Sequence, residues 1–246
     1  MEGETCWAVV ARPTYEVDPN HFRVGYCSPS SQESCVAMTP IDVAPVSLTS
    51  GVEVEYERRI AQATPKDTAR GLFFNGVKAA VLSLGGETSL QQCQTLLNDP
   101  RFEKRFVDFS SYPVADFLRM ALAASQVLSP QLGGPEKTQR RLGMQAMRDF
   151  LNSMAGRTLL LLSGESPKRV MGNLISGYRS AVNYGERTVT VQGENSARVS
   201  MKRDFMLPLY NEGVLLALLE AVHAKTPLVR ARPISLLDCD YELTWG

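Results

Sequence analysis

The stretches TVTVQ at 188–192 and ARVSM at 197–201, joined by GEN at 193–195, decide the fold class of this chain. β-Branched or apolar residues alternate with polar ones on both sides of a glycine-containing turn, which is typical of an antiparallel hairpin. A helix is expected next over 210–223, and a second pair of strands over 227–234 and 236–245. Because these strands are grouped in hairpins and do not alternate with helices, the order β-β-α-β-β predicts an α+β fold with a four-stranded antiparallel sheet.

Upstream of this hairpin the apolar residues recur at helical spacing, which predicts a layer of helices packed on the sheet. Asp67 or Thr68 can cap a first helix that Gly85-Gly86 should end, and a second helix is expected over 89–97. Pro113 begins a third helix with an apolar stripe that reaches Leu128. Two further helices are expected after Gly133-Gly134-Pro135 and after Ser166-Pro167.

The beginning of the chain has a different composition from the rest. Five prolines at positions 13, 19, 29, 40 and 45 separate short candidate strands, a pattern that favours extended backbone. We therefore expect a Pro-rich arm over residues 1–57, ordered in part at best, and a single α+β domain over residues 58–246.

Composition excludes several classes of protein. Lysine plus arginine (26) equal aspartate plus glutamate (26), so the overall charge predicts no nucleic-acid partner. The basic residues between Gly134 and Met171 favour a solvated helix face. The sequence holds no apolar run long enough for a membrane span, and its opening lacks the basic and apolar regions of a secretion signal. Five cysteines without a CxxC pair are typical of a reducing compartment, so a cytoplasmic location is expected.

Motifs for catalysis or metal binding are missing from the sequence. Only His21 and His223 supply imidazoles, and the chain has no HExxH, GxSxG or GxGxxG pattern. The segment GGPEKT at 133–138 resembles a phosphate-binding loop, but Pro135 removes an amide donor and Glu136 replaces the required glycine. We predict no catalytic residue, no metal and no cofactor. An enzyme with converging acids such as Asp204, Glu212 and Asp238 remains the alternative.

Methionine and phenylalanine are concentrated on helices that are expected to face one another. Such side chains either fill an ordinary core or adapt to an apolar ligand, because the unbranched thioether of methionine fits irregular spaces. Following the second interpretation, the predicted walls of a ligand pocket are Phe117, Met147, Phe150, Met154 and Tyr178.

Several stretches resemble a family of uncharacterised proteins that is expanded in myxobacteria. They are RGLFFNG at 70–76, FLNSMAGRTLLLL at 150–162, the segment 167–184, YNEG at 210–213 and DYELTW at 240–245. The resemblance extends from about residue 58 to residue 246 and brings no biochemical role with it. More remotely, the order of elements is similar to the superfamily of four-vinyl-reductase-type domains, vesicle-tethering subunits and haem nitric-oxide-binding domains.

The remote resemblance implies a helical layer over a four-stranded sheet, frequent dimers, and an apolar pocket for a small aromatic molecule, an acyl chain or haem. The haem-propionate motif Tyr-x-Ser-x-Arg is not matched, because Tyr178-Arg179-Ser180 has a different order. We therefore expect a cytoplasmic, non-catalytic regulatory or sensor domain that binds a small apolar ligand. The alternative is a protein-interaction module that acts as a homodimer or with another protein and takes no small ligand.

Overall fold

The computed structural model describes residues 51–246 of the chain, so most of the expected arm lies outside the described residues. The predicted boundary at residue 57 is wrong, because it falls inside helix α1 (Gly51–Gln62). Tyr56 on this helix is completely buried, and its hydroxyl donates a hydrogen bond to Oε1 of Gln139 at 2.6 Å. The Arg59 guanidinium donates to the carbonyl oxygens of Asp204 and Met206, so α1 is part of the folded domain.

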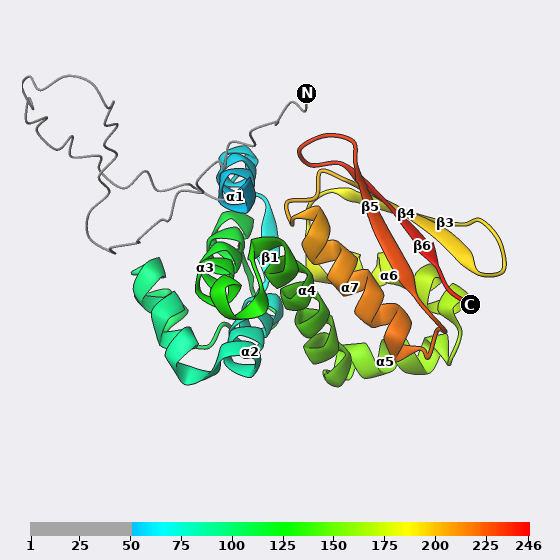
Figure 1. Cartoon of the computed structure of the whole chain (residues 1–246), viewed down its shortest axis with the longest axis horizontal. Coiled ribbons are helices and arrows are strands. Elements are labelled where there is room, and N and C mark those ends of the chain that lie inside the picture. Colours follow the sequence, from blue (N-terminus) through cyan, green and yellow to red (C-terminus); the bar gives the residue numbers. More distant parts are fainter. Residues whose placement is uncertain (1–50) are drawn as a thin grey trace, which may run out of the picture. The chain divides into compact units, whose positions relative to one another are not determined.

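Helices make up most of the first two thirds of the domain, and Figure 1 shows their arrangement. Their bounds are α2 Gly71–Leu97, α3 Val114–Leu132, α4 Pro135–Asn152, α5 Met154–Ser163, α6 Pro167–Ala181 and α7 Pro208–Ala221, with a 3-10 turn at Pro100–Phe102. The two helices expected on either side of Gly85-Gly86 are both present within α2, joined by a kink at Gly86, whose backbone is not helical (φ 75°). Among residues 51–246 no helix has the length and apolar character needed to cross a membrane.

Two antiparallel sheets complete the domain. Strands β1 (Thr68–Arg70) and β2 (Ser111–Pro113) form a short pair beside α2 and α3. The larger sheet has the order β3-β4-β6-β5, with β3 at Glu186–Val191, β4 at Ser196–Lys202, β5 at Leu228–Pro233 and β6 at Cys239–Thr244. All three pairings in this sheet are antiparallel, and the predicted α+β fold class is confirmed.

One face of the larger sheet is buried against α7. Strict alternation along β4 places Ala197, Val199 and Met201 on this face, and Tyr241 and Leu243 of the neighbouring strand β6 join them. These side chains belong to one apolar cluster with the α7 leucines Leu215, Leu218 and Leu219. The period-2 pattern of the sequence thus gives the sheet its buried face.

Helices α4 and α7 approach each other so closely that their backbones touch (Figure 1). A Cβ atom at Gly143 would overlap the carbonyl oxygen of Tyr210, and one at Gly213 would overlap that of Arg140. Ion pairs from Arg140 to Glu212 and from Arg148 to Glu220 reinforce the same contact. Two of the basic residues in the 134–171 segment therefore contribute to helix packing.

Candidate functional site

A cavity of about 100 Å³ lies beside α4, α6 and α7. Four of the five predicted pocket residues line it, because α3 supplies Phe117, α4 supplies Met147 and Phe150, and α6 supplies Tyr178. The structure thus brings together side chains that are up to about sixty positions apart in the sequence.

Met154 does not belong to the cavity, so its inclusion among the predicted wall residues is wrong. The spacing of Met147, Phe150 and Met154 predicts that all three lie on one face of a single helix. The helix is interrupted at Ser153, whose extended backbone ends α4 and whose side chain caps α5 by accepting a hydrogen bond from the Gly156 amide. The new helix direction leaves Met154 87% exposed.

Most of the cavity wall is apolar. Leu174, Val214 and Met206 join the predicted aromatic and methionine residues, and Phe73 stacks on Phe150 with ring centroids 6.0 Å apart. A second hollow of about 350 Å³ borders on Phe73, Ala146 and Phe150 as well. The stacked rings of Phe73 and Phe150 therefore line both spaces.

One part of the wall is polar, and sequence reasoning missed most of it. Nη2 of Arg187 lies 2.5 Å from Oδ2 of Asp204, and both side chains are only 6% exposed. The other carboxylate oxygen of Asp204 accepts a hydrogen bond from the Met206 amide at 2.9 Å. The Arg187 guanidinium also lies 4.9 Å from the ring centroid of Tyr178 and 5.3 Å from that of Tyr184. The sequence offered no signal for this cluster, because Arg187 sits at the start of an ordinary alternating strand.

Three polar atoms of the cavity residues are buried without a hydrogen-bond partner. They are Oη of Tyr178, Nε of Arg187 and Nδ2 of Asn211. Burial, reinforced by the Asp204 carboxylate, raises the pKa of the Tyr178 hydroxyl well above its ordinary value. The hydroxyl therefore keeps its proton at physiological pH, and all three atoms are hydrogen-bond donors.

Of the three acids in the enzyme alternative, one lines the cavity. Asp204 lines the cavity, whereas Glu212 accepts hydrogen bonds from Arg140 and from the Ala231 amide. Asp238 accepts a hydrogen bond from the Arg203 amide at 2.8 Å. Within residues 51–246 no three histidine, cysteine or acidic side chains are grouped in a way that could hold a metal ion.

Solved structures with a similar fold include H-NOX proteins. The H-NOX protein from K. algicida, in its unliganded Fe(II) state, has 11% identity and a TM-score of 0.57, covering 72% of this chain and 96% of that one. The S. oneidensis protein in the Fe(II)NO state has 10% identity and a TM-score of 0.57, covering 72% and 99%. The protein from Shewanella woodyi, bound to IWP-051 in the Fe(II)CO state, has 14% identity and a TM-score of 0.55, covering 72% and 94%. The expected remote resemblance is confirmed at the level of the fold for the haem nitric-oxide-binding (H-NOX) domains.

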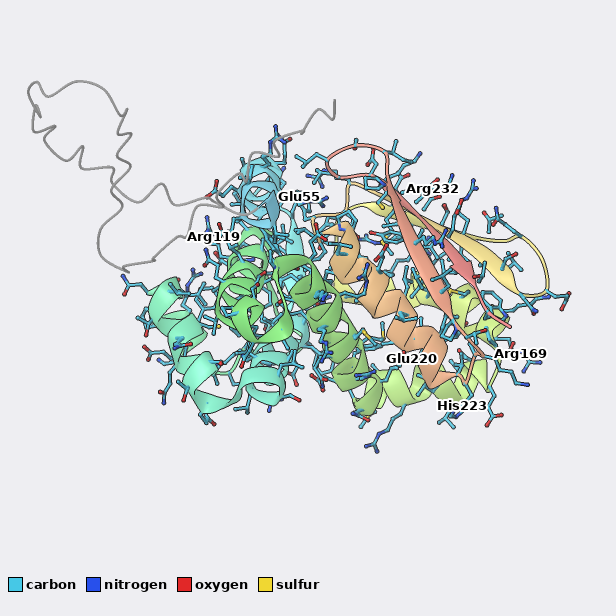
Figure 2. The ribbon with its side chains drawn as sticks, in the orientation of Figure 1. Glu55, Arg119, Arg169, Glu220, His223 and Arg232 are labelled. Atoms are coloured by element: carbon cyan, nitrogen blue, oxygen red, sulfur yellow. The ribbon has the colours of Figure 1, made fainter. Side chains whose placement is uncertain are left out.

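Haem, which this resemblance implies, does not fit the residues of the cavity. A cavity of about 150 Å³ accommodates one benzene molecule, so a space of about 100 Å³ is too small for a porphyrin macrocycle. The lining residues include neither a histidine nor a cysteine. His223, the single histidine among residues 51–246, is exposed beyond the C-terminal end of α7 (Figure 2). The tyrosine and arginine side chains of the wall are packed against one another and against Asp204.

Two comparisons at the level of sequence complete these findings. No curated protein matches this chain significantly. The family described as "Protein of unknown function (DUF2378)" matches residues 62–246, which is well over half of the chain. The myxobacterial distribution expected for the family stays a prediction. On this match, the chain belongs to the DUF2378 family.

Proposed function

We propose that this domain is a cytoplasmic, non-catalytic sensor that binds a small apolar molecule in the cavity beside α4, α6 and α7. The observation that carries the proposal is the cavity itself, about 100 Å³ of space with mostly apolar walls and one polar end. Protein interiors are close-packed, so unfilled apolar space beside a few unpartnered donors favours a binding site. Its volume favours a molecule of about the size of a five-membered ring.

A sensor role without catalysis is supported by the state of the polar groups. The Asp204 carboxylate accepts a hydrogen bond from Arg187 on one oxygen and from the Met206 amide on the other, so both of its oxygens are already engaged within the protein. The Arg187 guanidinium is likewise held by Asp204 and by the Tyr184 carbonyl. Groups that are paired in this way can position a ligand.

Cyclopentane is a suitable probe for the proposed site, because it is apolar and small. We expect saturable shifts of the Met147, Leu174 and Val214 methyl signals in NMR titrations of the full-length chain. The variant Ala146→Leu should abolish these shifts, because Ala146 lines the cavity and three added carbons fill part of it.

The matched control is Ala155→Leu, which makes the same change at an exposed position of α5. This variant should bind cyclopentane as the unmodified chain does. Absence of saturable binding to the unmodified chain, or equal binding by Ala146→Leu, would contradict the proposed function.

The interaction module remains a second candidate function, favoured by a different observation. Met154, Leu161 and Leu162 of α5 are 87%, 83% and 69% exposed, and their spacing places them on one face of the helix. An exposed apolar group of this kind is typical of a protein contact, here with a second copy of the chain. Sedimentation equilibrium should then show a dimer that the double variant Leu161→Glu, Leu162→Glu converts to monomer. A monomer at all concentrations of the unmodified chain would exclude this candidate.

A further inference from the structure

We propose that the molecule bound in the cavity carries a neutral carbonyl group, whose oxygen accepts hydrogen bonds from Oη of Tyr178 and Nε of Arg187. This inference rests on the proposed function and names the chemical class of the ligand. It follows from the unpartnered donors in the wall and from the charge balance around them.

The first observation is that the unpartnered polar atoms of the cavity residues are all donors. A buried donor without an acceptor costs stability, and most such groups in folded proteins have a partner. Tyr178 and Arg187 line the same cavity, and the guanidinium lies over the phenol ring at 4.9 Å. Asn211 adds a third donor, but because its amide also interacts with Tyr241, Tyr178 and Arg187 define the site. A carbonyl oxygen has two lone pairs and can accept from two donors at once.

The second observation is that the polar end of the cavity carries no net charge. Arg187 is matched by Asp204, with both side chains buried to the same degree. Arg59 of α1 contacts the segment that carries Asp204, but its guanidinium is paired with Glu55 and donates to backbone carbonyls. Arg203, which precedes Asp204 in the chain, is paired with Asp67. A carboxylate ligand would be buried near Asp204 without a cation of its own, which is unfavourable.

The third observation concerns the protonation state of Tyr178. Because burial raises the pKa of its hydroxyl, the residue donates and does not ionise under ordinary conditions. Its phenol ring is held between α6 and the Arg187 guanidinium, so the donor is positioned before any ligand arrives. A positioned donor binds an acceptor with less loss of conformational freedom.

The test compares three probes of similar size, cyclopentanone, cyclopentane and isobutyrate, by NMR titration of the full-length chain and of Tyr178→Phe. The variant removes only the hydroxyl. We expect it to weaken cyclopentanone binding by about three- to tenfold, the usual range for one neutral hydrogen bond, and to leave cyclopentane binding unchanged. Isobutyrate, which presents an anion, should bind the unmodified chain more weakly than cyclopentanone.

Tyr112→Phe is the matched control, because Tyr112 lies outside the cavity and its hydroxyl accepts a hydrogen bond from the Val107 amide. It should change the affinity for neither ring. If Tyr178→Phe leaves the affinity for cyclopentanone unchanged, or weakens the binding of cyclopentanone and cyclopentane equally, the carbonyl inference is wrong. The proposed function, binding of an apolar molecule in the cavity, is not contradicted by that result. If isobutyrate binds more tightly than cyclopentanone, the inference that the ligand is neutral is wrong. If neither ring binds, the proposed function fails together with the inference.

Discussion

The aromatic cluster around Phe74 and the cavity beside Tyr178 share the ring of Phe117, yet they are packed in opposite ways. Phe74 is completely buried, and its ring centroid lies 4.6 Å from that of Phe106, 5.2 Å from that of Phe117 and 5.5 Å from that of Tyr112. The space around Phe74 is filled, and the Tyr112 hydroxyl has a partner in the Val107 amide. The cavity leaves about 100 Å³ unfilled and the Tyr178 hydroxyl without a partner. The aromatic cluster stabilises the fold through close packing. The cavity is less closely packed and leaves space and unpartnered donors.

The largest effect is expected from opening the filled region. Phe74→Ala should lower the free energy of unfolding by about 3–5 kcal/mol, because it removes a buried ring and leaves a new cavity. Urea denaturation measures this loss. Phe109→Ala, which truncates a ring that is 83% exposed, is the control and should cost less than about 0.5 kcal/mol. Similar losses in both variants would show that the aromatic cluster is not a close-packed core.

The next largest effect concerns the polar end of the cavity. Arg187→Met should cost about 3 kcal/mol in unfolding free energy, because it leaves the buried Asp204 carboxylate without its cation. The double variant Arg187→Met, Asp204→Asn removes both charges and should recover part of that loss. A double variant no more stable than the single one would indicate that Arg187 acts through packing on the tyrosine rings.

Two buried tyrosines allow a smaller and sharper comparison. The hydroxyl of Tyr56 donates to Gln139, whereas that of Tyr178 has no partner. Tyr56→Phe should therefore cost about 1–2 kcal/mol, and Tyr178→Phe about zero or a slight gain in unfolding free energy. Equal losses in thermal or urea unfolding would show that the Tyr178 hydroxyl already has a partner in solution, such as a bound water molecule.

The smallest effect is expected from the ion pair between Arg203 and Asp67. Burial opposes ionisation of Asp67, but hydrogen bonds from Arg203 and Thr64 outweigh it, so the pKa of this carboxyl is lowered. A lowered folded pKa gives stability that is present above the unfolded pKa, about 3.9, and is lost as the pH falls through the folded value. Because Arg203 is nearly half exposed, the contribution should be about 1 kcal/mol at most.

The measurement is the free energy of unfolding between pH 5 and about pH 2.5, by urea titration. Arg203→Met should flatten the decline toward acid relative to the unmodified chain. Arg70→Met is the control, because it removes an exposed arginine that donates to the Phe109 carbonyl and the Ser111 hydroxyl, and it should leave the acid slope unchanged. An acid slope that is unchanged by Arg203→Met would contradict the assignment.

The sequence predicted the sheet and the helical layer because their signals are local. Alternation along β3 and β4 and the glycine-containing turn between them lie within residues 186–202. Met154 was misplaced because a single capping residue, Ser153, redirects the chain without interrupting the apolar pattern. Residues 51–57 were assigned to the arm because α1 is polar overall and buries Tyr56 and Arg59 against partners far along the chain.

The candidate site could be predicted only on its apolar side. Helical spacing identified Phe117, Met147, Phe150 and Tyr178, since residues on inward faces of packed helices meet in space. The polar side depends on Arg187 and Asp204, which are brought together by the return of the chain after β4. Neither residue stands in a recognisable motif, so only tertiary structure reveals the pair.

The backbone contact between α4 and α7 at Gly143 and Gly213 restricts how the cavity can enlarge. Moving these two helices apart would break the close backbone contact at both glycines and the two ion pairs between the helices. We therefore expect α4 and α7 to keep their relative positions. Extra room for a bulkier occupant would then come from other walls of the cavity, among them α6, which carries Tyr178. Because α6 leads within a few residues into β3, we expect a displacement of α6 by an occupant to be transmitted to this edge strand of the larger sheet.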